Sequence, residues 1–338
     1  MDLFSTNTLR GVVESLTLPP SFLLDTYFGN VQTETTEEIH FDVISKTRRL
    51  APFVSPVVAG KVVDAQGFTT KTFKPAYIKP KTPWNPGAPL KRIAGEQIGG
   101  SLNPMDRLRF LVAQTVSDHQ EQIRRRLEVM ASEALRTGIV TVSGDQYPTT
   151  AVNFGRDGSL TVTLTGGSRW GQTGIKPLAD LQTWGLLVLK KSGANAINVT
   201  MDVDAWTTFK ADADVIARLD TRRVTDNAMS MNAVTQEGGV YMGTIDGFNI
   251  YVYASWYIDD NGAEQPVLPS GTVIMGSSQI EGVQAFGAIQ DEANGYQAMP
   301  MFPKSWVEQD PAVRYIMTQS APLVVPTRAN ASFCATVL

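Results

Sequence analysis

The stretch from Pro104 to Thr137 constrains this chain more than any other part of it. Its apolar residues recur at spacings of three and four, the period of one face of an α-helix. Asn103 suits the N-cap, Pro104 the first helical position, and Gly138 the left-handed residue that follows a helix. At about 1.5 Å per residue the helix extends roughly 50 Å and crosses a whole subunit. We therefore expect a spine helix whose buried stripe comprises Leu108, Val112, Val116, His119, Ile123, Leu127, Met130 and Ala134.

Two extended segments of opposite charge precede this helix. Residues 1–45 hold seven acidic residues and one basic residue, a net charge of −6. Residues 61–92 hold seven basic residues and one acidic residue, a net charge of +6, and their prolines exclude the interior of a sheet. Neither segment can close an apolar core alone. We therefore expect the acidic arm of one chain to pack on the basic loop of a neighbouring chain, where opposite charges fix the register.

The residues expected at this subunit interface are acids of the arm, bases of the loop and two aromatic anchors. They are Glu34, Glu37, Glu38, Lys71, Lys74, Lys79, Lys81, Tyr77 and Trp84. Because an exposed ion pair contributes only about 0–1 kcal/mol, specificity must come from the summed pattern and the anchors. Arg222 and Arg223 could also bridge to acids of another chain or grip phosphate, and a solvated helix end is an equally good interpretation.

Beyond the spine helix the sequence predicts an α+β body. Residues 151–154 and 160–164 read as a hairpin through Asp157-Gly158, and Asp246-Gly247 marks another turn. One helix is expected from Pro177, and a single further helix from Asp204 to about Leu219. Residues 331–337 again show the alternation of apolar and polar side chains that is typical of a strand. We therefore expect the last third of the chain to return and complete the sheet begun before residue 165. That domain would be discontinuous.

Residues that could carry catalysis or hold a metal are scarce. His40, His119 and Cys334 are the only histidines and cysteine, too few for a disulfide framework or a typical His/Cys metal site. We expect His119 and Cys334 to be buried core residues. The sequence thus predicts no catalytic residue, no metal site and no cofactor. The enzyme alternative, a β-rich hydrolase using Asp212 or Asp259, would need a concave acidic pocket.

Charge and hydropathy exclude further classes of protein. The net charge of −4 is not that of a strongly basic nucleic-acid binder. We found no apolar run near 18 residues and no signal-peptide pattern, so we expect no membrane span and synthesis in the cytosol. Charged residues make up only 18% of the chain, which favours extensive burial between subunits.

The order of acidic arm, basic loop, spine helix, split sheet and inserted α/β region resembles the Hong Kong 97 type fold of tailed-phage major capsid proteins. The chain is most similar to the lambda-type major head proteins within that fold. The matching stretches run in the same order along nearly the whole chain and are Val54–Gly60, Tyr77–Lys81 with Asn85-Pro86, Leu219–Arg223, Asn261-Gly262 before Leu268-Pro269, Ala288–Asp291, Pro303–Trp306, Asp310-Pro311 and Met317–Leu323.

The resemblance implies four parts. Residues 1–50 would be an N-terminal arm, 51–102 an extended β loop over an adjacent subunit, 103–175 with 291–338 a peripheral domain, and 176–290 an axial domain. The subunits would form pentamers and hexamers of an icosahedral head around double-stranded DNA, assembled in the host cytoplasm.

The resemblance also implies partners: a portal protein, a scaffolding protein and a possible decoration protein. No long extension precedes the arm, so the scaffold is expected to be a separate protein. The lysine–asparagine crosslink of some fold relatives does not transfer, since no motif identifies its lysine. An encapsulin-like compartment shell, with the same fold and an enzyme cargo, is the alternative.

Overall fold

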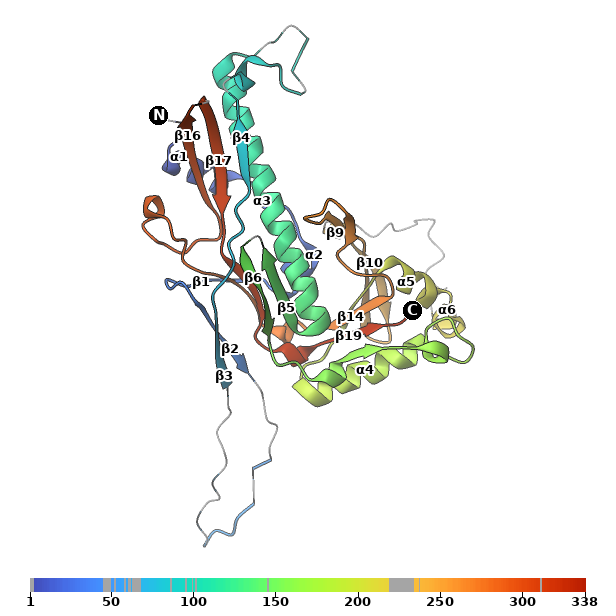
Figure 1. Cartoon of the computed structure of the whole chain (residues 1–338). Helices are drawn as coiled ribbons and strands as arrows, with labels where there is room; N and C mark the ends of the chain where they lie inside the picture. The colour runs from blue at the N-terminus through green and yellow to red at the C-terminus, as the bar shows by residue number, and fades with distance from the viewer. Residues whose placement is uncertain are drawn as a thin grey trace.

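The computed structural model describes residues 3–44, 50–51, 53–57, 59, 62, 68–85, 87–94, 96–98, 100, 102–144, 146–218, 234–236, 238–310 and 312–338. The predicted spine helix is confirmed as α3 (Pro104–Thr137), which runs from the top of the view to about its middle (Figure 1). Asn103 Oδ1 accepts the N–H of Asp106 at 2.8 Å, and Gly138 has φ +70°. The caps therefore begin and end the helix where the sequence placed them.

Arg156 closes the C-terminal end of α3. Its guanidinium donates to the carbonyl oxygens of Leu135 and Arg136, which have no partner within the helix. The Arg156 side chain packs against Gly138 so closely that a Cβ there would collide with it. Burial lowers the pKa of Arg156 to about 10.

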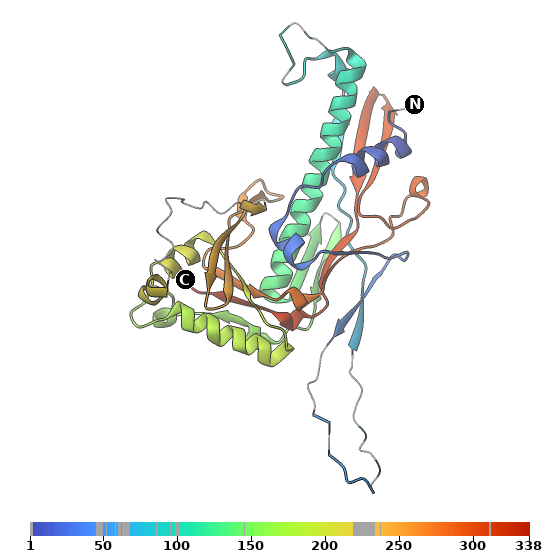
Figure 2. The same ribbon diagram turned by 180° about the vertical axis from the view of Figure 1, so that it is seen from behind.

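The N-terminal arm lies on the spine helix of its own chain. It contains α1 (Thr6–Ser15), α2 (Phe22–Tyr27) and β1 (Asn30–Thr33), and β1 pairs parallel with β15 (Gly282–Phe286), beside β18 (Pro322–Pro326). Next, β2 (Ile39–Ile44) and β3 (Phe68–Phe73) pair antiparallel, and this hairpin points away from the body (Figures 1 and 2).

Two small sheets flank the spine helix. β4 (Lys81–Trp84) pairs with β17 (Ala312–Gln319), which pairs with β16 (Phe302–Gln309). Directly after α3, β5 (Ile139–Gly144) pairs with β6 (Tyr147–Asn153). Their apolar faces and the arm bury most of the predicted α3 stripe, from Val112 to Ala134.

A seven-stranded sheet forms the other half of the molecule. Its order is β7 (Thr161–Thr163), β19 (Ser332–Thr336), β14 (Thr272–Gly276), β8 (Asn198–Met201), β11 (Phe248–Tyr253), β10 (Gly239–Ile245) and β9 (Val234–Gln236). Helices α4 (Pro177–Ser192), α5 (Val203–Lys210) and α6 (Ala213–Arg218) accompany it, and a short hairpin joins β12 (Trp256–Ile258) to β13 (Glu264–Pro266). Trp170, Trp184 and Phe333 stack in its core.

The C-terminal strand returns to the sheet begun before residue 165, as the sequence predicted, because β19 pairs parallel with β7. The turn at Asp246-Gly247 is also confirmed, with both residues at positive φ between β10 and β11. This sheet combines strands from the predicted peripheral range (β7, β19) with strands from the predicted axial range. The four-part division of the chain stays a prediction.

Two expectations were wrong. The 151–154 strand pairs with β5, not with 160–164, because Gly155 at φ +72° and a 3-10 turn at Gly158–Leu160 lead the chain away to β19. The helix expected from Asp204 to Leu219 is two helices. Asp212 interrupts it, because its carboxylate accepts the N–H groups of Asp214 and Val215 and starts α6.

Candidate subunit interface

The β2–β3 hairpin brings part of the acidic arm beside the basic loop within one chain. Glu37 forms an ion pair with Lys74, whose hydrogen bond lowers the pKa of Glu37, and the same contact raises the pKa of Lys74. Lys71 Nζ donates to a backbone carbonyl oxygen of β6 at 2.6 Å. Glu34 and Glu38 lie on the same arm segment. One of the charge pairs expected between copies is therefore already formed within the subunit.

Residues 77–84 of the basic loop contact the body of their own subunit. Tyr77 Oη donates to a carbonyl oxygen at residue 288, at 2.9 Å, and accepts a backbone N–H from residue 290. The Lys79 ammonium lies 4.5 Å from the centre of the Tyr77 ring, and Lys81 lies 4.6 Å from a tyrosine ring of β17. The rings of Trp84 and Phe4 of the arm form a T-shaped contact. These side chains anchor the loop in place, and their contact with a second copy stays a prediction.

Arg222 and Arg223 lie outside the described residues. Their predicted roles stay predictions.

Helix α2 of the arm is held by a buried carboxylate of the spine helix, which sequence reasoning missed. Glu128 is only 4% exposed, and its two oxygens accept the N–H groups of Leu23 and Leu24, each at 2.8 Å. Tyr253 Oη donates to the same carboxylate at 2.8 Å. Burial raises the pKa of Glu128. One turn earlier on α3, Arg124 pairs with Asp25 of α2. The i, i+4 spacing of Arg124 and Glu128, beside the apolar stripe, was the available signal.

Three glycines make room for the arm on the strands behind it. A Cβ at Gly239 would collide with the ring of Phe22, and one at Gly276 with the ring of Tyr27. At Gly282 it would collide with the backbone of α2. Thus α2 fits into a socket between the spine helix and the sheets. This corrects the expectation that the arm finds its packing only on a neighbouring chain.

The connection between β2 and β3 has apolar side chains that its own subunit leaves uncovered. Leu50, Phe53, Val57 and Val62 are each more than 90% exposed. At about 25 cal/mol per Å², leaving such side chains in water forgoes 1.5–3 kcal/mol each. Several exposed apolar side chains on one segment are typical of a surface that binds a partner.

The residues considered for catalysis have structural contacts. His119 is buried, with its ring nitrogens 2.9 Å from Thr82 Oγ1 and 3.1 Å from Thr318 Oγ1. Cys334 is buried, which raises its pKa to about 11. Asp212 caps α6, and Asp259 accepts two backbone N–H groups of its own turn, which lowers its pKa.

Within the described ranges, no group of three or more His, Cys, Asp and Glu side chains is placed to hold a metal ion. The helices of those ranges include none that is both long and apolar enough to cross a lipid bilayer.

Comparison with known proteins decides the family. The profile of a family described as phage major capsid protein E matches residues 5–337. The chain belongs to this family. As a phage major capsid protein it is a structural component of the virion, and it assembles with other copies into the icosahedral shell of the head.

Individual relatives agree with the family match. The major capsid protein of Escherichia phage lambda is 29% identical over 335 residues, and that of Enterobacteria phage P21 is 30% identical, with 96% of both chains covered in each case. A crystal structure of a prophage capsid protein from E. coli CFT073 superposes with a TM-score of 0.78 at 22% identity, over 99% of each chain. The capsid protein of cyanophage P-SCSP1u, at 8% identity, gives 0.50 over 95% of this chain and 89% of that one. The Hong Kong 97 type fold expected from the sequence is thereby confirmed.

Proposed function

We propose that this capsid protein tiles the head as pentamers and hexamers and that it carries no catalytic activity. The observation that carries the proposal is the hairpin that points away from the body and leaves Leu50, Phe53, Val57 and Val62 uncovered. Apolar side chains at the end of an extended hairpin gain free energy when a neighbour covers them. In this proposal each hairpin lies over the adjacent subunit.

The same proposal assigns roles to the charged side chains of the loop. Lys71, Lys74, Lys79 and Lys81 lie along residues 68–84, and Lys74 keeps 60% of its side chain exposed beside Glu37. They would add electrostatic steering when the hairpin approaches an acidic neighbour. Arg222 and Arg223 would serve the same contact between copies.

The partners follow from the family role. We propose that assembly occurs in the host cytoplasm, with a separate scaffolding protein, around a portal protein, and that a decoration protein binds the finished shell. Double-stranded DNA would be enclosed without sequence reading, as the net charge of −4 suits a container better than a DNA reader. An encapsulin-like compartment is the weaker alternative, because the family and the relatives named above are capsid proteins of phages.

Expression of the chain, alone and with the scaffold gene from its genomic neighbourhood, tests the proposal. Size-exclusion chromatography and negative-stain electron microscopy are expected to show rings and closed shells. A protein that stays monomeric under all these conditions would contradict the proposal. Shells that enclose an enzyme in place of DNA would favour the encapsulin-like alternative.

Charge reversal tests the role of the loop. Changing Lys71, Lys74, Lys79 and Lys81 to Glu is expected to block assembly while the far-ultraviolet circular dichroism spectrum stays unchanged. Reversal of the exposed Lys190 on α4 and Lys210 on α5 is the control for a change of charge elsewhere on the subunit. Normal shells from the loop variant at low salt, where charge attraction is least screened, would refute this role.

A further inference from the structure

A cavity of about 520 Å³ lies between the N-terminal arm and the body of its own subunit. Its lining comes from the arm, the spine helix, β15 and residues 299–301. In Figure 2, α1 of the arm lies against the spine helix at this place. Binding sites for small molecules usually measure about 300–1,000 Å³. The cavity, which we call the arm cavity, therefore has the size of a small-molecule site.

The lining of the arm cavity is mostly apolar. Leu127 of the spine helix and Phe286 of β15 are buried, whereas Leu18 and Val31 of the arm are 48% and 55% exposed. The other apolar side chains of the lining are Val13, Leu16, Met299, Pro300 and Met301. Methionine side chains are unbranched and polarisable, so they adapt to the shape of a ligand. An apolar molecule that enters the cavity gains free energy because it leaves water.

The charged side chains of the lining balance one another. Arg124 forms an ion pair with Asp25 and also donates to a backbone carbonyl oxygen of the arm. Arg10 and Glu14, one turn apart on α1, add one charge of each sign. The lining of the arm cavity thus has no net charge, which favours a neutral ligand over an ionic one.

Gln120 of the spine helix is the polar side chain that sets the chemistry of the site. It lines the cavity and is only 1% exposed. Its Nε2 donates to the carbonyl oxygen of Val13 at 3.1 Å, which identifies the other amide atom as the oxygen. Within the part of the chain that the structure describes, this Oε1 is buried and has no hydrogen-bond partner. A buried acceptor without a donor is rare and destabilising, so a ligand that supplies one N–H or O–H removes this penalty.

We propose that the arm cavity binds a neutral small molecule that has an apolar body and one N–H or O–H donor. The apolar body packs among Leu127, Phe286 and Met301. Because Gln120 lines the cavity, a small rotation of its side chain brings Oε1 to the donor of the ligand. A ligand there contacts the arm and the body together and holds the arm on its own subunit. The site lies within one subunit, so the inference does not depend on the proposed function.

Indole tests the site because it is neutral, has an apolar ring system and carries one N–H donor. Benzofuran is the matched control ligand, since an oxygen atom replaces the N–H in a molecule of nearly the same shape. In the unassembled subunit with ¹³C-methyl methionine, indole is expected to shift the NMR signals of Met299 and Met301. The signals of Met105 and Met242, exposed methionines outside the cavity, should stay in place. Indole is expected to bind at least about fivefold more tightly than benzofuran, the difference that one hydrogen bond makes.

A substitution at residue 120 tests the role of the amide. Gln120→Met removes the acceptor and keeps the length and helix propensity of the side chain, so it should bind indole and benzofuran equally well. Gln122→Met, at an exposed position of the same helix, is the matched control and should keep the wild-type preference for indole. If Gln120→Met does not fold, the comparison of the two ligands on the wild type decides alone.

Three results would overturn the inference. They are unchanged Met299 and Met301 signals at the solubility limit of indole, equal affinity of the wild type for indole and benzofuran, and an undiminished preference for indole in Gln120→Met. Each of them leaves the proposed function intact, because shell formation is measured separately by electron microscopy.

Discussion

Replacing Glu128 tests whether the arm is held by the spine helix of its own chain. In Glu128→Ala the N–H groups of Leu23 and Leu24 and the hydroxyl of Tyr253 lose their common acceptor, a carboxylate that is only 4% exposed. A buried donor left without a partner costs about 1–3 kcal/mol. Since the three donors share one site and their costs do not simply add, we expect a loss of about 3–5 kcal/mol in the free energy of unfolding.

The isosteric variant separates the hydrogen bonds from packing. Glu128 Oε1 accepts from both Leu23 and Tyr253, and Oε2 only from Leu24. Gln can keep the first two bonds and removes a buried charge, so Glu128→Gln should lose less than about 1.5 kcal/mol. Glu121→Ala, an exposed acid two turns earlier on the same helix, should stay within about 0.5 kcal/mol of the wild type.

Chemical denaturation of the unassembled subunit measures these differences, and hydrogen exchange at the amides of residues 23 and 24 locates them. The Ala variant should exchange at these two amides far faster than the wild type, while amides in the middle of α4 change little. The reasoning is refuted if the free energy of unfolding of Glu128→Ala falls by less than about 1 kcal/mol, or if Glu128→Gln and Glu128→Ala lower it by the same amount.

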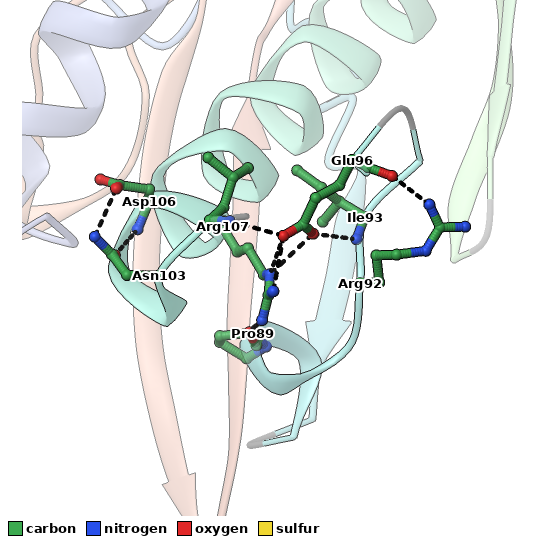
Figure 3. Close-up of polar contacts among 8 residues, drawn as sticks. Pro89, Arg92, Ile93, Glu96, Asn103, Asp106 and Arg107 are labelled. Carbon is green, nitrogen blue, oxygen red and sulfur yellow. Dashed lines mark hydrogen bonds and ion pairs between the residues drawn. The ribbon is translucent and has the colours of Figure 1, made fainter. Parts of the chain in front are cut away.

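Three further predictions concern the other close contacts. Arg156→Ala leaves two carbonyl groups of the last spine-helix turn without donors. Thermal unfolding should show that the free energy of unfolding falls by about 2–4 kcal/mol. A decrease below about 1 kcal/mol would contradict the capping role. Gly276→Ala forces a methyl group against the ring of Tyr27, and urea titration should show a decrease of about 1–3 kcal/mol in the free energy of unfolding. Gly167→Ala, with open space around the added methyl group, should leave this free energy unchanged. Equal effects of the two substitutions would exclude the socket. The hydrogen bonds from Arg107 (Figure 3) hold the pKa of Glu96 at about 2, below the value near 4.3 in the unfolded chain. The ionised carboxylate therefore stabilises the fold fully above about pH 4.3, and this stabilisation is lost as the pH falls through about 2. The stability gap between the wild type and Glu96→Gln should therefore shrink from pH 7 to pH 2, and a constant gap would refute the assignment.

Features fixed by neighbouring residues were predictable from the sequence. The spine helix was placed to the residue because Asn103, Pro104 and Gly138 act within one turn of its ends. The Asp246-Gly247 turn was placed because both positions have positive φ, which these residues tolerate. Burial of His119 followed from its place on the apolar stripe.

Features fixed by distant residues were not predictable in this way. The partner of strand 160–164 is β19, more than 160 residues later in the chain, and the position of the arm depended on a carboxylate more than 100 residues away. The charge pattern correctly indicated that arm and loop attract, but net charge carries no information on whether they meet in one chain or two. The β2–β3 pairing gives that answer for Glu37 and Lys74.

The glycine socket has a consequence for the order of events during synthesis. Helix α2 leaves the ribosome before the residues that hold it, which are Glu128, Gly239, Gly276 and Gly282. It therefore cannot pack in its final place until residue 282 has been translated. Contacts this far apart in sequence form slowly. The packing of α2 is therefore one of the later steps in the folding of the subunit, after the strands that carry these glycines have been made.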